Sequence, residues 1–477
     1  MRTTNFGGNI ALNPRSFYTP ETEQEVLEIL DRHQGQRIRC IGRLHSWSKA
    51  IEAHDVLLDL RRLNHVRTAD PNHQLSVDVG AGCQIKRLLT ELERQRNWTL
   101  PSLGLITEQS VAGAVSTATH GSGRNSLCHY VMSVRVARYD NVTGRATITE
   151  ITEGVELRAA RCSLGCLGII LSVQMQCRSA YRVEESFHEY SQLSEVVAAE
   201  EQFPLQQFFL IPWRWSYMAQ HRRESSSDPS ATAGLYRWYR FLTIDVAMHL
   251  LILLLVRLIR VKSLIRLIFR RVIPTFVVRD WSVADQSSPQ LVMEHELFRH
   301  IELELFVTRE RLEPAMQFVE QVLCVAGGTV QEIDKSFRTR LSEVGLEEDL
   351  CAVAGIYCHH FPICIRKVLP DDALISMSSP GNASADELAD SPWYAITFTC
   401  YARGKDRNAF ETVGRFLSRS MASLFAARPH WGKLCYLQPA ELRKLYPQFA
   451  AFRRVCKEYD PNGNFQNDWT RGLLEEA

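Results

Sequence analysis

The sequence predicts an α+β fold in two parts, and three observations support this prediction. First, 477 residues exceed the size of one ordinary hydrophobic core. Second, residues 1–180 mix short alternating strands with helices and glycine corners. Third, alternating strands return at 301–307 and 394–401, with a helix expected over 310–325. We therefore expect domains over 1–180 and 181–415, followed by a C-terminal segment over 416–477.

Composition narrows the class of protein. The chain is 45% hydrophobic and 23% charged with a net charge of +1, so no overall basic field predicts nucleic-acid binding. Its thirteen cysteines are odd in number and show no CxxC spacing. This pattern favours reduced thiols in the cytoplasm over a disulfide framework or a zinc site, and we expect no metal. The first residues lack an apolar core segment, so we expect no signal peptide.

Two stretches of the first domain are candidate sites. The alternating strand 37–41 runs into Gly42, Arg43, Leu44, His45 and Ser46. A histidine in such a turn is either functional or an ordinary hydrogen-bonded residue. Small residues then dominate 101–104 and 110–123. Backbone must come close to something else there, either a bound phosphate or a neighbouring strand. Cys162 and Cys166 lack a second ligand pair, so we do not expect them to hold a metal.

Together with the Ser-Leu-Gly-Cys-Leu-Gly turn at 163–168 and the Arg-Pro-His-Trp-Gly-Lys stretch at 428–433, these segments resemble the FAD-linked oxidases of the vanillyl-alcohol oxidase superfamily. The likeness is greatest to the sugar-lactone oxidases, including L-gulonolactone and D-arabinono-1,4-lactone oxidases, and to alditol oxidase. The resemblance implies a PCMH-type FAD-binding domain, a substrate-binding cap and a C-terminal segment that returns to the flavin. It implies D-arabinono-1,4-lactone oxidase-like activity on a small polyhydroxy substrate, with O2 as acceptor and H2O2 as product.

The resemblance also implies particular site residues. His45 corresponds to the histidine that bonds covalently to the flavin. The expected cofactor-binding residues are Gly42, Arg43, Leu44, His45, Ser46, Gly104, Ser110, Gly113, Ser116, His120, Gly121, Gly168, Ile170 and Lys433. The expected catalytic residues are Arg366, Lys433, His360 and Cys364. A glycine at 104 leaves a path for oxygen to the flavin, which favours an oxidase over a dehydrogenase.

One position departs from the resembled family. Its members carry a Glu-x-Arg pair on a cap strand, whereas this chain has Cys364 two residues before Arg366. A thiol cannot orient a sugar hydroxyl as a carboxylate does. Three interpretations follow. In the first, Glu304 or His360 takes over the role of the missing glutamate. In the second, the chain is a flavin oxidase or dehydrogenase that acts on a more apolar substrate, and in the third it is a membrane-associated flavoprotein with degraded catalysis.

Residues 235–274 form the least typical segment of the cap. An uncharged run at 246–256 is shorter than the roughly 20 residues that span a bilayer. A break near 261–263 places Leu264, Ile265, Ile268, Phe269 and Val272 on one face of a second helix. Arg266 and Arg270 then fall opposite, which predicts a basic amphipathic helix. Residues 246–273 are therefore expected either to contact a membrane peripherally or to dock on the protein itself or a dimer partner.

Overall fold

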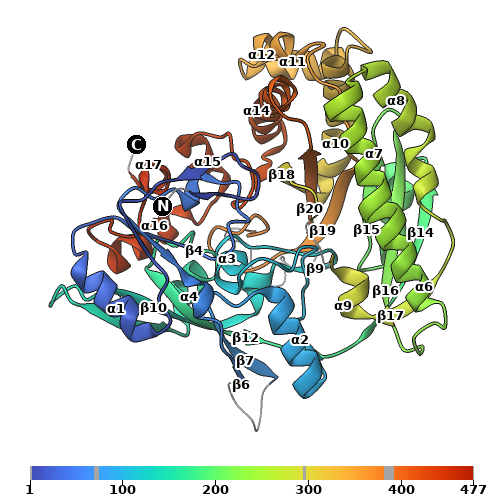
Figure 1. Ribbon diagram of the computed structural model, residues 1–477. Coiled ribbons are helices and arrows are strands. Elements are labelled where there is room, and N and C mark those ends of the chain that lie inside the picture. Colours follow the sequence, from blue (N-terminus) through green and yellow to red (C-terminus); the bar gives the residue numbers. More distant parts are fainter. Residues whose placement is uncertain (1–2, 69–74, 294–296, 381–390, 476–477) are drawn as a thin grey trace.

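The computed structural model describes residues 3–68, 75–293, 297–380 and 391–475, and both of its halves combine helices with sheet (Figure 1). The predicted α+β class is therefore confirmed. The N-terminal half holds a parallel three-stranded sheet of order β3–β5–β4 and an antiparallel five-stranded sheet of order β11–β10–β12–β7–β6. The strands of these two sheets, with the helices of this half, are β3 (Ser16–Tyr18), α1 (Glu23–Arg32), β4 (Ile38–Ile41), β5 (Val56–Asp59), β6 (Val66–Thr68), β7 (Ser76–Gly80), α2 (Ile85–Arg96), α3 (Val111–Ser116), β10 (Val131–Tyr139), β11 (Ala146–Ile151), α4 (Gly154–Ala160) and β12 (Ile169–Gln176).

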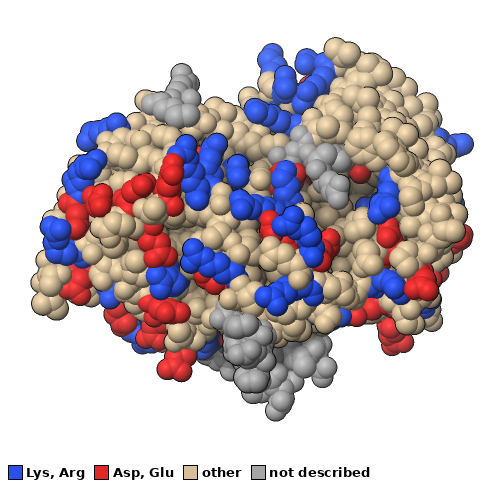
Figure 2. Space-filling model, turned by 60° about the horizontal axis from the view of Figure 1, so that its bottom comes forward, with Lys and Arg blue, Asp and Glu red and all other residues tan. Residues whose placement is uncertain are grey.

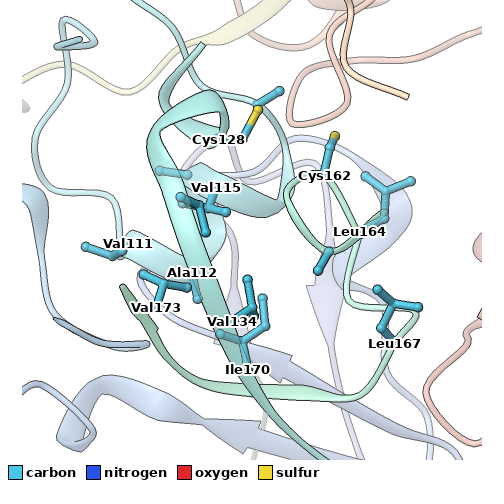
Figure 3. Close-up of a cluster of buried hydrophobic side chains, with 14 of the residues drawn as sticks. Val111, Ala112, Val115, Cys128, Val134, Cys162, Leu164, Leu167, Ile170 and Val173 are labelled. Carbon is cyan, nitrogen blue, oxygen red and sulfur yellow. The ribbon is translucent and has the colours of Figure 1, made fainter. Parts of the chain in front are cut away.

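Helix α3 explains the run of small residues. Its apolar side chains Val111, Ala112 and Val115 pack beside Val134 of β10 and Val173 of β12 (Figure 3). The thiols of Cys128 and Cys162 are buried in the same cluster, and all thirteen cysteines are free. One side of α3 therefore belongs to the core. The residues of its other side are small, so the backbone there stays accessible.

The second half is built on one long mixed sheet of order β17–β14–β16–β15–β19–β20–β18–β21, with β9 paired to β19. Its strands are β9 (Arg124–Asn125), β14 (Arg182–Tyr190), β15 (Gln207–Ile211), β16 (Ser216–Ser225), β17 (Val283–Gln286), β18 (Ile301–Thr308), β19 (Ile363–Leu369), β20 (Trp393–Cys400) and β21 (Arg428–Pro429). Its helices include α5 (Leu193–Ala198), α9 (Ser287–Leu291), α10 (Arg309–Gly327), α11 (Lys335–Glu343), α12 (Glu347–Val353) and α14 (Lys405–Phe425).

The two faces of this sheet have different neighbours. On β18, Leu303, Leu305 and Val307 join the core that includes α10 and α14. Phe306 belongs instead to the core of the N-terminal half. Because side chains alternate along a strand, Glu302 and Glu304 share the face of Phe306 and point toward the N-terminal half. The central strands thus present one row of side chains to the junction between the halves.

A helical hairpin covers the sheet on the right of Figure 1. Its first arm runs without interruption through α6 (Ala233–Tyr239), η5 (Arg240–Met248), α7 (His249–Leu254) and η6 (Leu255–Ile259), and η5 and η6 are π-helical. Arg260 is left-handed, with φ of 57°, and the second arm α8 (Lys262–Arg271) follows. The predicted break near 261–263 is confirmed. The first arm, at 27 residues, is much longer than the uncharged run and is long and apolar enough to cross a membrane.

The C-terminal segment returns to the N-terminal half. Strand β21 pairs with β18, and helices α15 (Pro439–Leu445), α16 (Phe449–Tyr459) and α17 (Asp468–Leu474) follow. The N–H of Ile38 in β4 donates to the carbonyl of Asn464, at 2.7 Å. The buried guanidinium of Arg39 donates to the carbonyls of Phe465, Ala50 and Leu164. These bonds position the end of β4, where the first candidate stretch begins.

Candidate active site

A cavity lies between the small-residue side of α3 and the row of side chains on the central cap strands. It has a volume of roughly 1420 Å³, counting the space at its open mouth. Thirteen of the predicted cofactor-binding residues line it: Gly42, Arg43, Leu44, His45, Ser46, Gly104, Ser110, Gly113, Ser116, His120, Gly168, Ile170 and Lys433. Gly121 does not line this cavity, because its backbone packs against Leu103 and borders a smaller neighbouring pocket.

The turn after β4 is shaped by close backbone contacts. A Cβ on Gly42 would lie 2.0 Å from the Oγ of Ser110, so only glycine lets the turn approach α3. Leu44 adopts a left-handed conformation with φ of 59°. The ring of His45 stacks against Phe6, with 5.5 Å between centroids, and borders the cavity. Ser46 Oγ donates to the carbonyl of Gly432 at 3.2 Å, which joins this turn to the C-terminal motif.

Two features of the wall fit a bound dinucleotide. The Nε of Arg43 is buried and has no hydrogen-bond partner in the part of the chain that the structure describes. At Gly113, an added Cβ would meet only the Oγ of Ser110 within 4 Å, so this backbone is open on the cavity side. The residues present therefore fit FAD.

Two carboxylates face the cavity from β18, the half-buried Glu302 and the buried Glu304. Glu302 pairs with the ammonium of Lys433, and Thr399 Oγ1 donates to Glu302 Oε1 at 3.3 Å. The ammonium of Lys433 also lies 4.5 Å from the centroid of the Trp47 ring. Burial alone would raise the pKa of Glu302, but Lys433 and His300 outweigh it and hold that pKa well below its usual range. Lys433 is therefore a fixed cation on the wall of the cavity.

Glu304 is held on one of its two oxygens. Its Oε1 lies 3.1 Å from His120 Nε2 and accepts from Thr397 Oγ1 at 3.0 Å. The other ring nitrogen of His120, Nδ1, contacts the carbonyl of Gly121 at 2.9 Å. Burial would raise the pKa of Glu304, yet the histidines His120 and His430, together with Lys433, hold it well below its usual range. Glu304 is thus an ionised carboxylate whose hydrogen bonds to described residues all fall on Oε1.

The strand register explains how Glu304 comes to lie here. Cys364 of β19 is opposite Thr397 of β20, and Thr397 is opposite Glu304 of β18. These three residues form one row across the sheet. Thr397, Glu302 and Gln207 were not anticipated from the sequence. The alternation of 394–401 indicates two faces for that strand, but it does not indicate which face borders the cavity.

Two predicted catalytic residues lie away from the cavity wall. Cys364 is buried with its Sγ 3.9 Å from Gln207 Oε1, and burial raises the pKa of its thiol to about 11. His360 is also buried, its Nδ1 is 3.2 Å from the carbonyl of Cys358, and its Nε2 accepts from the N–H of Tyr401 at 3.2 Å. Burial lowers the pKa of His360 to about 4, so it is neutral at pH 7. We therefore assign neither residue a contact with substrate.

Arg366 does line the cavity. Its Nε donates to Gln207 Oε1 at 3.0 Å, and one terminal nitrogen lies 3.9 Å from Glu304 Oε1.

The site also contains a cluster of three side chains of metal-ligating type: His120, Glu304 and His430. Their donor atoms lie within 4.8 Å of one another. His120 and Glu304 are already bonded to each other, and His430 Nδ1 accepts from the N–H of Gly432 at 2.9 Å. These contacts make the cluster a hydrogen-bonded support for Glu304.

The fold and this site define an FAD-dependent oxidoreductase that acts on CH–OH donors. A model of the D-arabinono-1,4-lactone oxidase family matches residues 173–473, and an FAD-binding-domain model matches residues 14–144. The chain therefore belongs to the D-arabinono-1,4-lactone oxidase family, within the vanillyl-alcohol oxidase superfamily. FAD is its cofactor, as the sequence predicts.

Relatives differ in the substrate that their names give. A long-chain alcohol oxidase of an uncultured marine euryarchaeote is 55% identical over 99% of this chain and 96% of its own length. The L-gulono-1,4-lactone dehydrogenase of Mycobacterium tuberculosis is 26% identical over 99% of this chain and 98% of its own length. The cholesterol oxidase of B. sterolicum superposes with a TM-score of 0.71 at 15% identity, over 99% of this chain and 96% of that structure, which supports the fold.

Proposed function

We propose that this protein oxidises the hydroxyl of a long-chain alcohol and uses O2 as the electron acceptor. The observation that carries the proposal is the row Cys364–Thr397–Glu304. Where sugar-lactone oxidases resembling this chain carry a glutamate, Cys364 turns to Gln207 and leaves the cavity wall. Glu302 is engaged by Lys433, so Glu304 is the carboxylate with an oxygen left for substrate. One such acceptor suits an alcohol with a single hydroxyl. The 55% identical relative named as a long-chain alcohol oxidase supports the same substrate class.

The residues of the cavity divide the chemistry between them. The flavin, when bound, accepts a hydride from the carbinol carbon and passes the two electrons to O2. Glu304 Oε2 accepts the hydroxyl proton as the C–H bond breaks. Lys433 and Arg366 supply positive charge at the wall and stabilise an electron-rich cofactor. Overall, an alcohol and O2 give an aldehyde and H2O2.

The electron acceptor is proposed from Gly104. It lies on the cavity wall, and a Cβ there would meet Thr119 Cγ2 at 3.0 Å and the carbonyl of His120 at 3.3 Å. The resemblance to the sugar-lactone oxidases implies that a glycine here leaves a path for O2 to the flavin, and this supports O2 as the acceptor. The close contacts with Thr119 and His120 also account for the glycine by packing.

A second candidate substrate is an aldonolactone or alditol. The polar groups of Glu302, Thr397, Lys433 and Arg366 on one wall favour it, as does membership of the D-arabinono-1,4-lactone oxidase family. This candidate requires the ion pair between Lys433 and Glu302 to open, because several hydroxyls must find partners.

A panel of substrates separates the two candidates. We expect peroxide release from primary alcohols, with kcat/KM rising about fourfold for each methylene that the site buries, since each is worth roughly 0.8 kcal/mol. L-gulono-1,4-lactone, D-arabinono-1,4-lactone and xylitol should give far lower kcat/KM values. Preference for these polyhydroxy compounds would establish the second candidate instead. No peroxide from either group, with FAD bound, would contradict both.

We also infer that His45 bonds covalently to FAD. The inference follows from the resemblance and from the position of the His45 ring on the cavity wall. Acid precipitation of the native protein should give a yellow pellet. The pellet of a His45→Ala variant should be colourless, with FAD recovered in the supernatant. The matched control Ser46→Ala alters the same turn and should keep its pellet yellow. A colourless native pellet contradicts the covalent bond.

We infer, finally, that the protein is peripherally associated with a membrane. A long-chain alcohol partitions into lipid, so an enzyme that acts on it gains access to its substrate there. The helix Ala233–Ile259 supports this location, because only 28% of its most apolar 18-residue stretch is buried within the protein.

A further inference from the structure

The outer face of the helical hairpin carries a stripe of large apolar side chains. Between residues 235 and 258 six large apolar residues are exposed: Leu235 at 65%, Trp238 at 63%, Leu242 at 53%, Leu250 at 51%, Leu254 at 44% and Leu258 at 76%. Ile259, Val261 and Leu267 continue the apolar surface around the turn and onto α8. Figure 2 shows a wide uncharged area at the right of the molecule, the side on which Figure 1 places α6, α7 and α8. We call the six residues the outer stripe.

The π-helical turns align this stripe. From Trp238 onward its members are four residues apart or a multiple of four. An α-helix has 3.6 residues per turn, so a four-residue spacing would wind around it. The turns of η5 and η6 hold more residues than α-helical turns, which brings the average of the arm to about four per turn. From Trp238 to Leu258 the side chains of the outer stripe therefore lie along one side of the arm.

The inner face ties the first arm to the cap sheet. Tyr236 and Arg240 both reach the buried Glu185 of β14, at 2.7 Å and 3.2 Å. Farther along, Met248, Ile252 and Leu255 belong to the core of the second half. These contacts would be lost if the arm crossed a bilayer. The structure therefore favours an arm that lies in the plane of a surface with only its outer stripe inserted.

The charge of the helical hairpin indicates the kind of surface that it contacts. Residues 233–279 contain nine Lys and Arg and one acid, Asp245. Several of these cations hold the fold: Arg266, for example, donates to the carbonyl of Gly327 and lies over Trp213. This differs from the sequence prediction, which placed Arg266 on the solvent side. Lys262, Arg270 and Arg271 are exposed at the two ends of α8, and the ammonium of Lys262 also donates to the carbonyl of Gly355 at 2.6 Å.

We propose that the outer stripe docks on an anionic lipid bilayer, with Trp238 and the leucines among the acyl chains and Lys262, Arg270 and Arg271 near the headgroups. The proposal rests on the peripheral location inferred above and adds to it the face, the orientation and the lipid charge. An apolar stripe beside basic side chains is the pattern of interfacial helices. It also gives a lipid-dissolved substrate a short path to the enzyme.

Vesicle flotation of the full-length protein tests the proposal. We expect the protein to float with vesicles of phosphatidylcholine and phosphatidylglycerol, and to bind at least tenfold more weakly to phosphatidylcholine alone. Leu254→Glu with Leu258→Glu should weaken binding at least tenfold, since two apolar side chains can no longer insert. The matched control Val142→Glu changes an apolar residue that is 93% exposed on the N-terminal half, and its binding should equal that of the native protein. Arg270→Glu with Arg271→Glu should remove the preference for anionic vesicles.

The results of these flotation experiments test the docking face and the peripheral membrane location separately. Native flotation that the stripe variant leaves unchanged overturns the docking face, although the location stands. A native protein that floats with neither vesicle overturns both. The stripe could instead mediate self-association, and the native protein would then be a dimer in analytical ultracentrifugation. If Leu254→Glu with Leu258→Glu converts this dimer to monomer and leaves vesicle binding unchanged, the proposal is also overturned. Folding of each variant is checked by its bound flavin absorbance.

Discussion

Replacement of Glu304 by glutamine is expected to lower kcat by about 10²–10⁴-fold while FAD remains bound. Glutamine keeps the shape of the side chain but cannot take up the proton of the substrate hydroxyl. It can still meet Thr397 and His120, which now hold Glu304 Oε1 at 3.0 and 3.1 Å. The decisive measurement is the rate of flavin bleaching in a single turnover without O2, because this rate reports the chemical step directly.

Cys364→Ala is the matched control for Glu304→Gln. Both residues belong to the same row of the sheet, but the Cys364 thiol is directed at Gln207 and is neutral at pH 7, since burial raises its pKa to about 11. We expect less than a threefold change in the bleaching rate. An equal loss in both variants would place the reacting hydroxyl nearer to Cys364. A normal rate in Glu304→Gln, with FAD bound, would show that another group receives the proton.

The pH dependence of the bleaching rate gives a second readout of Glu304. Burial would raise the pKa of this carboxyl, but His120, His430 and Lys433 hold it well below the usual value near 4.3. Because a depressed pKa keeps the carboxylate ionised above that value, the rate should not fall between pH 8 and pH 5 through protonation of Glu304.

The sequence points to the cofactor side of the site because several short segments together resemble one family, although each segment alone leaves its role open. These segments are local: Gly42 to Ser46 follow one strand directly, and the small residues of 110–116 make up the start and body of one short helix. Glycine and serine mark such places in a sequence because they let the backbone come close to a neighbour. The structure brings these segments to the wall of one cavity.

The substrate side could not be predicted because it depends on strand register. Glu304 and Cys364 are sixty residues apart and meet in one row only through Thr397. The alternation of side chains along a strand assigns them to the two faces of a sheet. It does not show which strands are neighbours or in which register they pair. His360 stands close to Arg366 in sequence, yet its ring turns to the backbone of Cys358 and Tyr401. The spacing in the helical hairpin was equally hidden, because the sequence gives no sign that its turns are π-helical.

Replacement of Glu185 by glutamine is expected to destabilise the cap by about 3–5 kcal/mol. Glu185 is fully buried between the buried Arg222 and the largely buried Arg240. Its Oε2 accepts from Arg222 Nε at 2.7 Å, and its Oε1 accepts from the hydroxyl of Tyr236 at 2.7 Å and lies 3.2 Å from Arg240. Burial would raise the pKa of Glu185, but Arg240 and Arg222 outweigh it and lower that pKa. Without the carboxylate, the buried guanidinium of Arg222 loses its counter-charge and Arg240 loses its ion pair with Glu185, and this cost dominates.

The neighbouring pair Glu184 and Arg223 provides the control for Glu185→Gln. It joins the same two strands by a contact of 2.9 Å, but its side chains are 29% and 46% exposed. Glu184→Gln should therefore change stability by less than about 0.5 kcal/mol. The two variants differ by one position along β14, so a large difference in melting temperature isolates the effect of burial. Equal melting temperatures would show that water or a local shift neutralises the buried cluster.

Hydrogen exchange locates the effect of Glu185→Gln. Tyr236 and Arg240 belong to the first arm of the helical hairpin, so loss of their common partner should release α6 and η5 before the rest of the cap. We expect faster amide exchange over 233–248 and unchanged exchange over α10 and α14, whose packing does not involve Glu185. Uniformly faster exchange would mean that the ionic cluster supports the whole sheet. Loss confined to the arm identifies Glu185 as the group that holds the outer stripe in place, because an arm that detaches cannot present its apolar side chains along one side.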